Sequence, residues 1–161
     1  MAKDQKTQIL FVCMGNICRS PLAECVFLAE SISRGVESEF EIDSAGTGGW
    51  HEGQDPDARM RDAAHAKGIK LSGSARQVRP EDFSRFEHIV CMDQQNRDAL
   101  LSMGAPSSKI SLLLEYDNSV TEQEVPDPYY GGEEGFHHVI DLVSSACQQL
   151  LDHLTKKREK R

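Results

Sequence analysis

The sequence has no long apolar run and no recognisable membrane anchor. No stretch approaches the roughly 18 apolar residues that a transmembrane helix needs. Residues 1–6, MAKDQK, do not form the apolar core of a secretory signal. The termini also lack a myristoylation start and a prenylation motif. We therefore expect no association with a membrane.

Cysteine is scarce and irregularly spaced. The five cysteines are an odd number, which argues against the disulfide framework of a secreted protein and favours the reducing cytoplasm. The six histidines do not combine with them at the spacing of a structural zinc site, so we expect no bound metal. The cysteines are Cys13, Cys18, Cys25, Cys91 and Cys147.

Positive charge is also in short supply. The chain has 18 Lys and Arg against 26 Asp and Glu, and 18 − 26 = −8 argues against broad binding to nucleic acid. Residues 156–161, KKREKR, hold five basic residues and one acidic residue; without them the charge is 13 − 25 = −12. A body this acidic should repel anions unless one local site holds them. We expect residues 1–155 to form one domain and the basic tail, 156–161, to be disordered.

Strand and helix signals alternate along the 161 residues. The unbroken run Ile9–Val12 is typical of a strand covered on both faces, and the alternating run Glu39–Asp43 of a strand at a sheet edge. The order predicts the α/β class, with a parallel sheet, helices on both faces and a ligand site beyond the carboxyl ends of the strands. The expected strands are 9–12, 39–43, 87–92 and 110–114, and the expected helices are 21–35, 57–67, 94–103 and 136–154.

The junction of the first strand and the first helix, residues 12–21, reads VCMGNICRSP. It lies between a buried strand and a helix with proline in its first turn, where backbone N–H groups converge and bind anions. Gly15 and Asn16 both tolerate the positive φ that a tight anion-binding loop requires. Although a bare Cys-x5-Arg spacing is weak evidence, this context predicts an oxyanion site.

Cys13 and Arg19 indicate the chemistry of this junction. A helix N-terminus, a ring of N–H donors and an arginine favour the thiolate form of Cys13, which is the nucleophile. The same donors bind phosphate oxygens, and Arg19 can hold two of them at once, as lysine cannot. Cys13 would then attack phosphorus in line, and the Ser20 hydroxyl would ease the later departure of the thiolate. The alternative is a buried structural cysteine beside a surface arginine.

Asp127 stands between Pro126 and Pro128 in the loop after the fourth expected strand. That loop lies on the carboxyl side of the sheet, as Cys13 does. The carboxyl group can therefore protonate a leaving oxygen and then activate water, a role worth about 10²–10⁴-fold. The alternative is a turn residue, the more usual role of an aspartate in a loop of this composition.

Five segments of the sequence form a specific pattern: residues 12–24 (VCMGNICRSPLAE), 44–46 (SAG), 75–77 (ARQ), 91–93 (CMD) and 127–131 (DPYYG). Together these segments resemble the low molecular weight protein tyrosine phosphatase family, from about Gln8 to Leu154. The resemblance implies a three-layer α/β fold of flavodoxin-like or Rossmann-like topology, with a four-stranded parallel sheet in the order 2-1-3-4.

The resemblance also implies the roles of the site residues. Cys13 is the nucleophile of a phosphocysteine intermediate, Arg19 binds phosphate, and Asp127 is the general acid and base. The implied enzyme is a cytoplasmic, monomeric protein-tyrosine phosphatase without metal or cofactor. It acts on phosphotyrosine proteins and aryl phosphates and binds inorganic phosphate and similar oxyanions. The phosphate-binding residues are Met14, Gly15, Asn16, Ile17, Cys18 and Ser20, and the walls around the phenyl ring are Trp50, Tyr129 and Tyr130.

Two positions depart from, or refine, the family pattern. Relatives that resemble arginine phosphatases carry threonine at the position of Ile17, so Ile17 favours phosphotyrosine. Many members have a histidine before the ARQ segment that supports the loop asparagine, whereas this chain has Gly73 and no histidine in that stretch. Asn16 is therefore expected to bond Ser44 or Ser20 instead.

Cys18, inside the loop, has two interpretations. It is either a small buried residue or a resolving thiol that forms a reversible disulfide with oxidised Cys13, which would make the enzyme redox-sensitive.

Two other functions compete with a phosphatase. A thiol-based arsenate reductase needs further cysteines close enough to relay a disulfide, and no close pair lies outside the loop. A non-catalytic phosphotyrosine-binding module would not need Cys13, Arg19, Ser20 and Asp127 together. For a phosphatase, the acidic body is expected to disfavour substrates with strongly acidic peptide around the phosphotyrosine.

Overall fold

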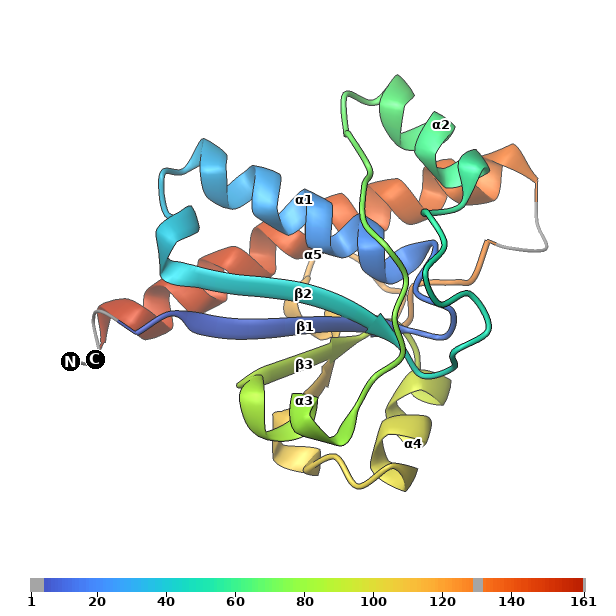
Figure 1. Cartoon of the computed structure of the whole chain (residues 1–161). Coiled ribbons are helices and arrows are strands. Elements are labelled where there is room, and N and C mark those ends of the chain that lie inside the picture. The colour runs from blue at the N-terminus through green and yellow to red at the C-terminus, as the bar shows by residue number, and fades with distance from the viewer. Residues whose placement is uncertain (1–4, 129–131, 161) are drawn as a thin grey trace.

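The computed structural model describes residues 5–128 and 132–160 and is built around one parallel sheet (Figure 1). The strand order is β2-β1-β3-β4, and every pairing is parallel, so the predicted sheet and its 2-1-3-4 order are confirmed. β2 lies at the edge, as its alternating sequence predicts. The strands are β1 (Thr7–Cys13), β2 (Phe40–Gly46), β3 (His88–Cys91) and β4 (Ile110–Leu112).

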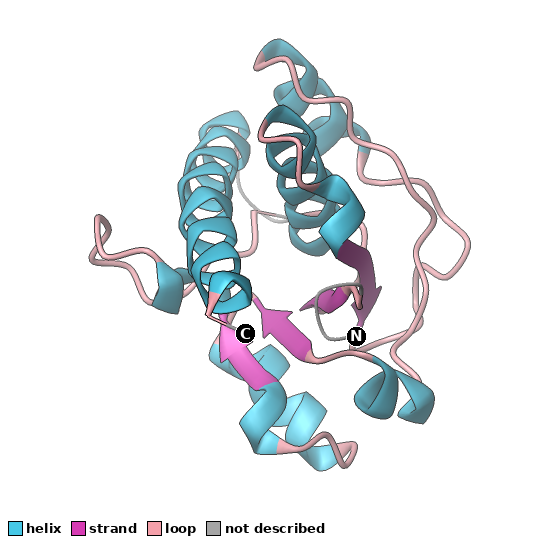
Figure 2. Ribbon diagram, turned by 90° about the vertical axis from the view of Figure 1, so that its left-hand side faces the viewer, coloured by secondary structure: helices cyan, strands magenta, loops and turns pink. Residues whose placement is uncertain are grey.

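Helices cover both faces of the sheet and complete the three layers (Figures 1 and 2). The long helices α1 and α5 lie side by side on one face, with α2 against α5, while α3 and α4 cover the other face. The helices are α1 (Arg19–Ser33), α2 (Ala58–Ala66), α3 (Pro80–Arg85), α4 (Gln94–Ser102) and α5 (Glu133–Glu159).

Strand β1 shows why an unbroken apolar run belongs at the centre of such a sheet. Successive side chains of a strand point to opposite faces. Ile9, Phe11 and Cys13 enter the core beneath α1 and α5, while Leu10 and Val12 enter the core above α3 and α4. All five are 0–2% exposed. β1 therefore ends with Cys13 at the carboxyl edge of the sheet, held by packing on both faces.

The apolar stripe predicted for the last helix is confirmed, since all of its residues are buried. On the first helix the stripe differs from expectation. Leu22 and Val26 are buried, but Ala29 is exposed, and Ala23 and Phe27 complete the buried face instead. The stripe of α5 is Val139, Leu142, Val143, Ala146, Leu150 and Leu154.

The structure corrects the expectation of a disordered basic tail, because α5 continues to Glu159. Arg158 holds this last turn: it donates hydrogen bonds to Glu39, to the backbone oxygen of Gln5 and to the hydroxyl of Thr7. Basic residues in the last turn also complement the helix dipole. The tail is thereby tied to the start of β1.

Two other elements differ from the expected ones. Residues 80–85 form the short helix α3, which the apolar pattern does not predict; it begins with Pro80 and is capped by Asp82. Strand β4 ends at Leu112 and passes into a 3-10 turn, Leu113–Tyr116. Among the described residues, no helix is both long enough and apolar enough to span a membrane.

Candidate active site

The loop between β1 and α1, residues 13–19, surrounds the sulfur of Cys13; we call it the phosphate loop. The Cys13 side chain is 2% exposed, and its Sγ lies 3.0 Å from the Ser20 hydroxyl and 3.4 Å from the Ser20 N–H. Ser20 lies in the first turn of α1, where backbone N–H groups have no partner within the helix. These donors favour a negative charge on the sulfur.

Asn16 is the residue that bends the phosphate loop. Its φ is 58°, and among the described residues it is the one non-glycine with positive φ. Its Nδ2 donates to the hydroxyls of Ser20 at 2.8 Å and Ser44 at 3.0 Å, so both partners expected in place of a histidine are used. Its Oδ1 accepts the backbone N–H of Arg76 at 3.0 Å.

Gly15 has a different role from the one its sequence suggests. It does not adopt positive φ, whereas Asn16 does. A Cβ at Gly15 would lie 2.9 Å from Cδ2 of His51, so glycine is needed because the imidazole ring packs directly over the loop. The loop backbone is therefore covered by a side chain from the segment after β2.

Arg19 is almost completely buried, with a side chain 3% exposed. Its Nη1 donates to Oδ2 of Asp93 at 2.6 Å and to the backbone oxygen of Val125 at 2.9 Å. Burial opposes the charge of the guanidinium, but the neighbouring Cys13 and Asp93 outweigh burial, and the pKa of Arg19 is raised. The cation is thus fixed beside the sulfur rather than free to reorient.

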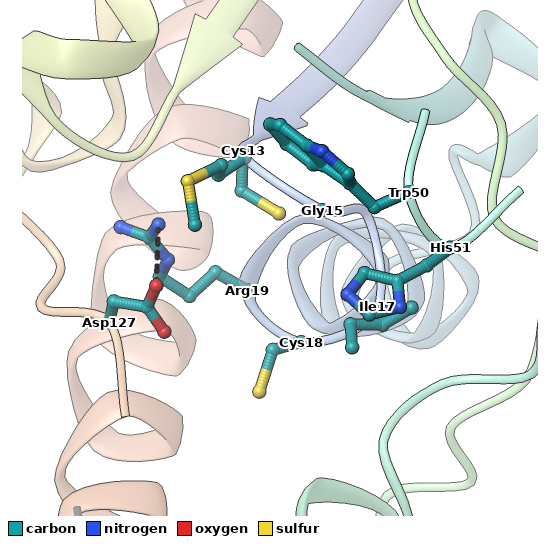
Figure 3. A pocket seen from close by; sticks show the side chains of 9 residues that line it. Cys13, Gly15, Ile17, Cys18, Arg19, Trp50, His51 and Asp127 are labelled. Atoms are coloured by element: carbon teal, nitrogen blue, oxygen red, sulfur yellow. Dashed lines mark ion pairs between the residues drawn. The ribbon is translucent and has the colours of Figure 1, made fainter. Parts of the chain in front are cut away.

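Asp127 lies beside the guanidinium of Arg19, across the cavity from Trp50 and His51 (Figure 3). It lies near the end of residues 117–128, which we call the acid loop. Its Oδ2 is 3.7 Å from Nη2 of Arg19, and its side chain is 31% exposed. The predicted meeting of Cys13, Arg19 and Asp127 at the carboxyl edge is therefore present in the structure.

These residues line a cavity of about 280 Å³ (Figure 3). Trp50 stands at its mouth, 70% exposed, and packs over Gly48, where a Cβ would overlap the indole ring. Ile17 and Met14 add apolar surface. Asn16 and Ser20 are buried beneath the cavity, and Tyr129 and Tyr130 lie outside the described residues. The lining residues are Cys13, Met14, Gly15, Ile17, Cys18, Arg19, Trp50, His51 and Asp127.

Cys18 lines the cavity but is 5% exposed. Burial, followed by the charges of Asp57 and Cys13, raises the pKa of its thiol. The thiol form therefore prevails at neutral pH, which suits a small buried residue and makes attack by Cys18 on another sulfur slow. Among the described residues, no group of three or more His, Cys, Asp or Glu is placed to bind a metal ion.

Sequence reasoning missed two residues of this site. His51 covers the phosphate loop, and its Nδ1 lies 3.0 Å from Oε1 of Gln54. Asp93 caps α4 with Oδ1, which accepts the Asn96 N–H at 2.8 Å, while its Oδ2 accepts Nη1 of Arg19 at 2.6 Å. The place of Asp93 directly after a parallel strand was the available signal, because such positions face the ligand edge.

A parallel α/β fold with a buried thiol, a fixed arginine and a carboxylate at one strand–helix junction is typical of a phosphatase. Comparison with known proteins is consistent with that class. The model of low molecular weight phosphotyrosine protein phosphatases matches residues 8–160. The chain belongs to this family, and its enzyme activity is that of a protein-tyrosine phosphatase.

Relatives from distant organisms match almost end to end. The low molecular weight protein-tyrosine-phosphatase YfkJ of Bacillus subtilis is 40% identical over 154 residues, which cover 94% of this chain and 97% of that protein. The human low molecular weight phosphotyrosine protein phosphatase is 36% identical over 156 residues, covering 94% and 98%. A crystal structure of a protein tyrosine phosphatase from Entamoeba histolytica aligns with a TM-score of 0.91 at 40% identity, covering 95% and 99%.

Proposed function

We propose that this chain hydrolyses phosphotyrosine in proteins, and aryl phosphates generally, through a phosphocysteine intermediate on Cys13. The observation that carries the proposal is the convergence of Cys13, Arg19 and Asp127 on one cavity, with the sulfur hydrogen-bonded to Ser20. A nucleophile, a phosphate-binding cation and a proton donor are the three groups that such a reaction requires.

In the first step the phosphate dianion enters the phosphate loop, where backbone N–H groups and Arg19 bind its oxygens. The Cys13 thiolate attacks phosphorus, so an S–P bond forms while the bond from phosphorus to the tyrosine oxygen breaks. The protonated carboxyl of Asp127 gives its proton to that oxygen, and neutral tyrosine leaves. Because Asp93 already holds Arg19, little reorganisation is needed when the dianion binds.

In the second step water attacks the phosphocysteine. The carboxylate of Asp127 takes a proton from the water, a new P–O bond forms, and the S–P bond breaks. The leaving thiolate is stabilised by the hydroxyl and N–H of Ser20, which lie 3.0 Å and 3.4 Å from the sulfur. Inorganic phosphate then dissociates, and Asp127 is protonated again for the next substrate.

The cavity mouth supports an aromatic leaving group. Trp50 and Ile17 offer apolar surface to a phenyl ring, and Tyr129 and Tyr130 are proposed as further walls. The phosphate-binding residues are proposed to be Met14, Gly15, Asn16, Ile17, Cys18 and Ser20. Substrates are then phosphotyrosine proteins or peptides, with phosphate and similar oxyanions as competing ligands. We propose a monomeric enzyme in a reducing compartment such as the cytoplasm, since all five cysteines are free thiols.

The test is hydrolysis of p-nitrophenyl phosphate. We expect turnover that resists EDTA, is fastest at mildly acid pH and is blocked by vanadate. Replacement of the nucleophile, Cys13→Ser, should reduce turnover to background while the variant keeps the folded circular dichroism spectrum and still binds phosphate. Appreciable turnover by the folded Cys13→Ser variant would contradict the mechanism.

We also propose that Cys18 protects the nucleophile from irreversible oxidation, because it lines the same cavity as Cys13; the raised pKa of its thiol means that this protection is slow. Peroxide converts Cys13 to a sulfenic acid; the Cys18 sulfur attacks it, an S–S bond forms and water leaves. After peroxide and then dithiothreitol, wild type should regain activity more fully than Cys18→Ser. Cys25→Ser, a partly exposed thiol outside the cavity, is the control. Equal recovery by wild type and Cys18→Ser would exclude a resolving role.

A further inference from the structure

A short segment behind the phosphate loop, residues 75–78, connects the loop to the segment that carries Trp50; we call it the bridging segment. Its backbone bonds the loop directly, because the Arg76 N–H donates to Oδ1 of Asn16 at 3.0 Å. Asn16 is the strained residue of the loop, with φ 58°. A donor at this point therefore stabilises the bend that places N–H groups around Cys13.

The bridging segment also holds both ends of the Trp50 segment. At one end the Gly46 N–H donates to the Arg76 oxygen at 2.8 Å, and the Val78 N–H donates to the Gly46 oxygen at 2.8 Å. At the other end the Gly53 N–H donates to the Ala75 oxygen at 2.7 Å. The loop that contains Trp50 is thus hydrogen-bonded at both ends to the bridging segment, residues 75–78.

Residues 46–48 lie between the bridging segment and the phosphate loop. The Thr47 N–H donates to the Cys13 oxygen at 2.9 Å, and the Gly48 N–H donates to the Met14 oxygen at 3.0 Å. A Cβ at Gly46 would lie 2.8 Å from the Met14 oxygen, so backbone packs directly on backbone here. Movement of the bridging segment must therefore move the wall and the phosphate loop together.

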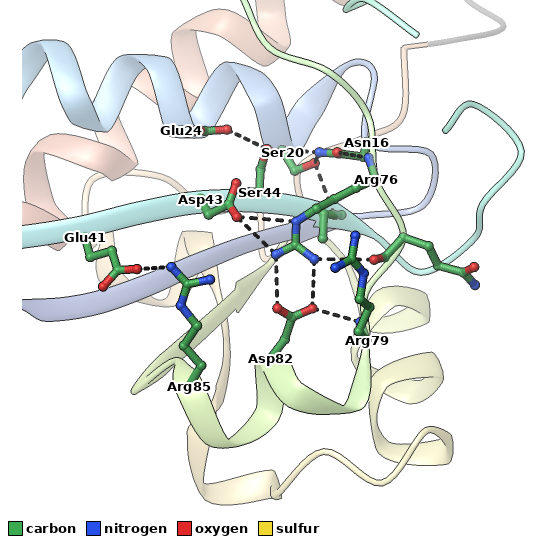
Figure 4. Close-up of polar contacts among 12 residues, drawn as sticks. Asn16, Ser20, Glu24, Glu41, Asp43, Ser44, Arg76, Arg79, Asp82 and Arg85 are labelled. Atoms are coloured by element: carbon green, nitrogen blue, oxygen red, sulfur yellow. Dashed lines mark hydrogen bonds and ion pairs between the residues drawn. The ribbon is translucent and has the colours of Figure 1, made fainter. Parts of the chain in front are cut away.

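The guanidinium of Arg76 fixes the bridging segment to the rest of the fold (Figure 4). Nη1 and Nη2 donate to the two oxygens of Asp82 on α3 at 2.9 and 3.1 Å, and Nε and Nη2 donate to Oδ2 of Asp43 on β2 at 3.3 and 3.1 Å. The Arg76 side chain is 19% exposed. Lysine could not bridge two carboxylates in this way, because it lacks the planar fork.

These contacts close a ring around the phosphate loop. Oδ1 of Asp43 accepts a hydrogen bond from the Ser44 N–H at 2.8 Å, and the Ser44 hydroxyl accepts one from Nδ2 of Asn16 at 3.0 Å. Oδ1 of Asn16 in turn accepts a hydrogen bond from the Arg76 N–H. Glu24 completes the support, because it accepts the Ser44 hydroxyl at 2.6 Å. The ring starts and ends at Arg76, once through its side chain and once through its backbone.

We propose that Arg76 is a positioning residue that couples the phosphate loop to the Trp50 wall. Oxyanion binding at Cys13 then changes the surroundings of the Trp50 indole. It contacts no substrate itself. The inference rests on the proposed function of the site. The chain offers a direct reporter, since Trp50 is its single tryptophan.

The test compares Arg76→Lys with Arg85→Lys. Arg85 also joins α3 to β2, through an exposed ion pair with Glu41, but it bonds nothing in the phosphate loop. We expect Arg76→Lys to lower kcat about tenfold or more, since a displacement of about 1 Å can cost on the order of 10²-fold. The rate of Cys13 alkylation by iodoacetate at pH 6 should fall several-fold, and the phosphate-induced change in Trp50 fluorescence should be lost. Arg85→Lys should match wild type in all three measurements.

Each outcome separates this inference from a structural role and from the proposed function. Wild-type kcat, alkylation and fluorescence response in Arg76→Lys overturn it, as do equal losses in Arg85→Lys. If Arg76→Lys does not fold, Asp43→Asn opens the ring while Asp82 still holds Arg76, and it should show the same losses in smaller measure. A wild-type protein that binds phosphate but hydrolyses nothing would contradict the proposed function, and the fluorescence comparison would still decide the role of Arg76.

Discussion

The phosphate loop and the acid loop supply the two halves of the proposed reaction, and they are held in different ways. Cys13, Asn16 and Arg19 are each 2–3% exposed, and the phosphate loop is bonded to β2, to the N-cap of α4 and to the bridging segment. The acid loop is anchored at Asp117, which accepts the hydroxyl of Ser145 on α5 at 2.5 Å, and at Val125, whose N–H donates to the Met92 oxygen at 2.9 Å. Asp127 lies beyond the second anchor.

This difference matches what each half must do. A nucleophile and its anion-binding donors work best when fixed before the substrate arrives, because no reorganisation is then needed in the transition state. A general acid must meet a bulky leaving group and let it depart, which a partly exposed side chain on a loop can do. Asp127, at 31% exposure, is accordingly the one member of the proposed catalytic trio that solvent reaches freely.

The largest effect should come from the acid loop. Asp127→Ala should lower kcat for p-nitrophenyl phosphate by about 10²–10⁴-fold, because the leaving oxygen loses its proton donor. Vanadate affinity should change little, since the phosphate loop remains intact. Asp127→Asn is the matched variant, because it keeps the shape of the side chain without its acidity, and it should show a similar loss. Equal losses of turnover and vanadate binding would instead make Asp127 a structural residue, and the contrast between the loops would disappear.

A smaller effect should come from Ser20, on the phosphate-loop side. Ser20→Ala removes the hydroxyl that stabilises the leaving thiolate, so hydrolysis of the phosphocysteine should become slower. We expect kcat to fall by about tenfold, as for the loss of a single charge-assisted hydrogen bond. Rapid mixing with p-nitrophenyl phosphate should then show a burst of nitrophenol followed by slow turnover.

The control for this variant is Ser31→Ala, a buried serine on the same helix whose hydroxyl bonds the Leu28 oxygen instead. It should behave as wild type. A fall in the rate of the burst itself would show that Ser20 acts in the first step, so the phosphate loop would assist attack rather than departure.

Features that depend on residues close together in the sequence could be predicted, whereas features that depend on contacts between distant residues could not. The β1 run and the spacing from Cys13 to Arg19 are local, so a strand, a turn and a helix start are encoded in about a dozen neighbouring residues. Asp127 required one topological step, the rule that parallel strands share a carboxyl edge.

What could not be foreseen depends on long-range contacts. His51 packs over Gly15, and nothing in the local pattern of either residue indicates it. The six residues of α3 are too few for an apolar period, and the helix is held by Asp82, which bonds Arg76 and caps the helix at Arg79. The helical tail likewise depends on Arg158 meeting residues near the other end of the chain.

The smallest effect concerns the stability of the fold in acid. It tests whether the ion pair between Asp82 and Arg76, which supports the phosphate loop, depends on pH. Burial acts to raise the pKa of Asp82, but hydrogen bonds from Arg76 and from the Arg79 N–H outweigh it, and the pKa lies below its usual value. A carboxyl whose pKa is depressed in the folded state adds stability above its unfolded pKa of about 3.9. That stability is lost as the pH falls through the lower, folded value.

Asp82→Asn should therefore lower the free energy of unfolding by about 1.5–3 kcal/mol at pH 7, the loss expected for hydrogen bonds to a charged group. The difference from wild type should shrink as the pH falls below about 4, where the carboxyl of the unfolded chain becomes protonated, and should vanish below the lower pKa of the folded state. Urea unfolding at several pH values measures it, with Asp152→Asn, at an exposed ion pair with Arg34, as the control. A difference that stays constant down to pH 2 would mean that Asp82 acts by shape and not by charge. Arg76 would then be held by packing, and the contrast between a rigid phosphate loop and an adaptable acid loop would not depend on ion pairs.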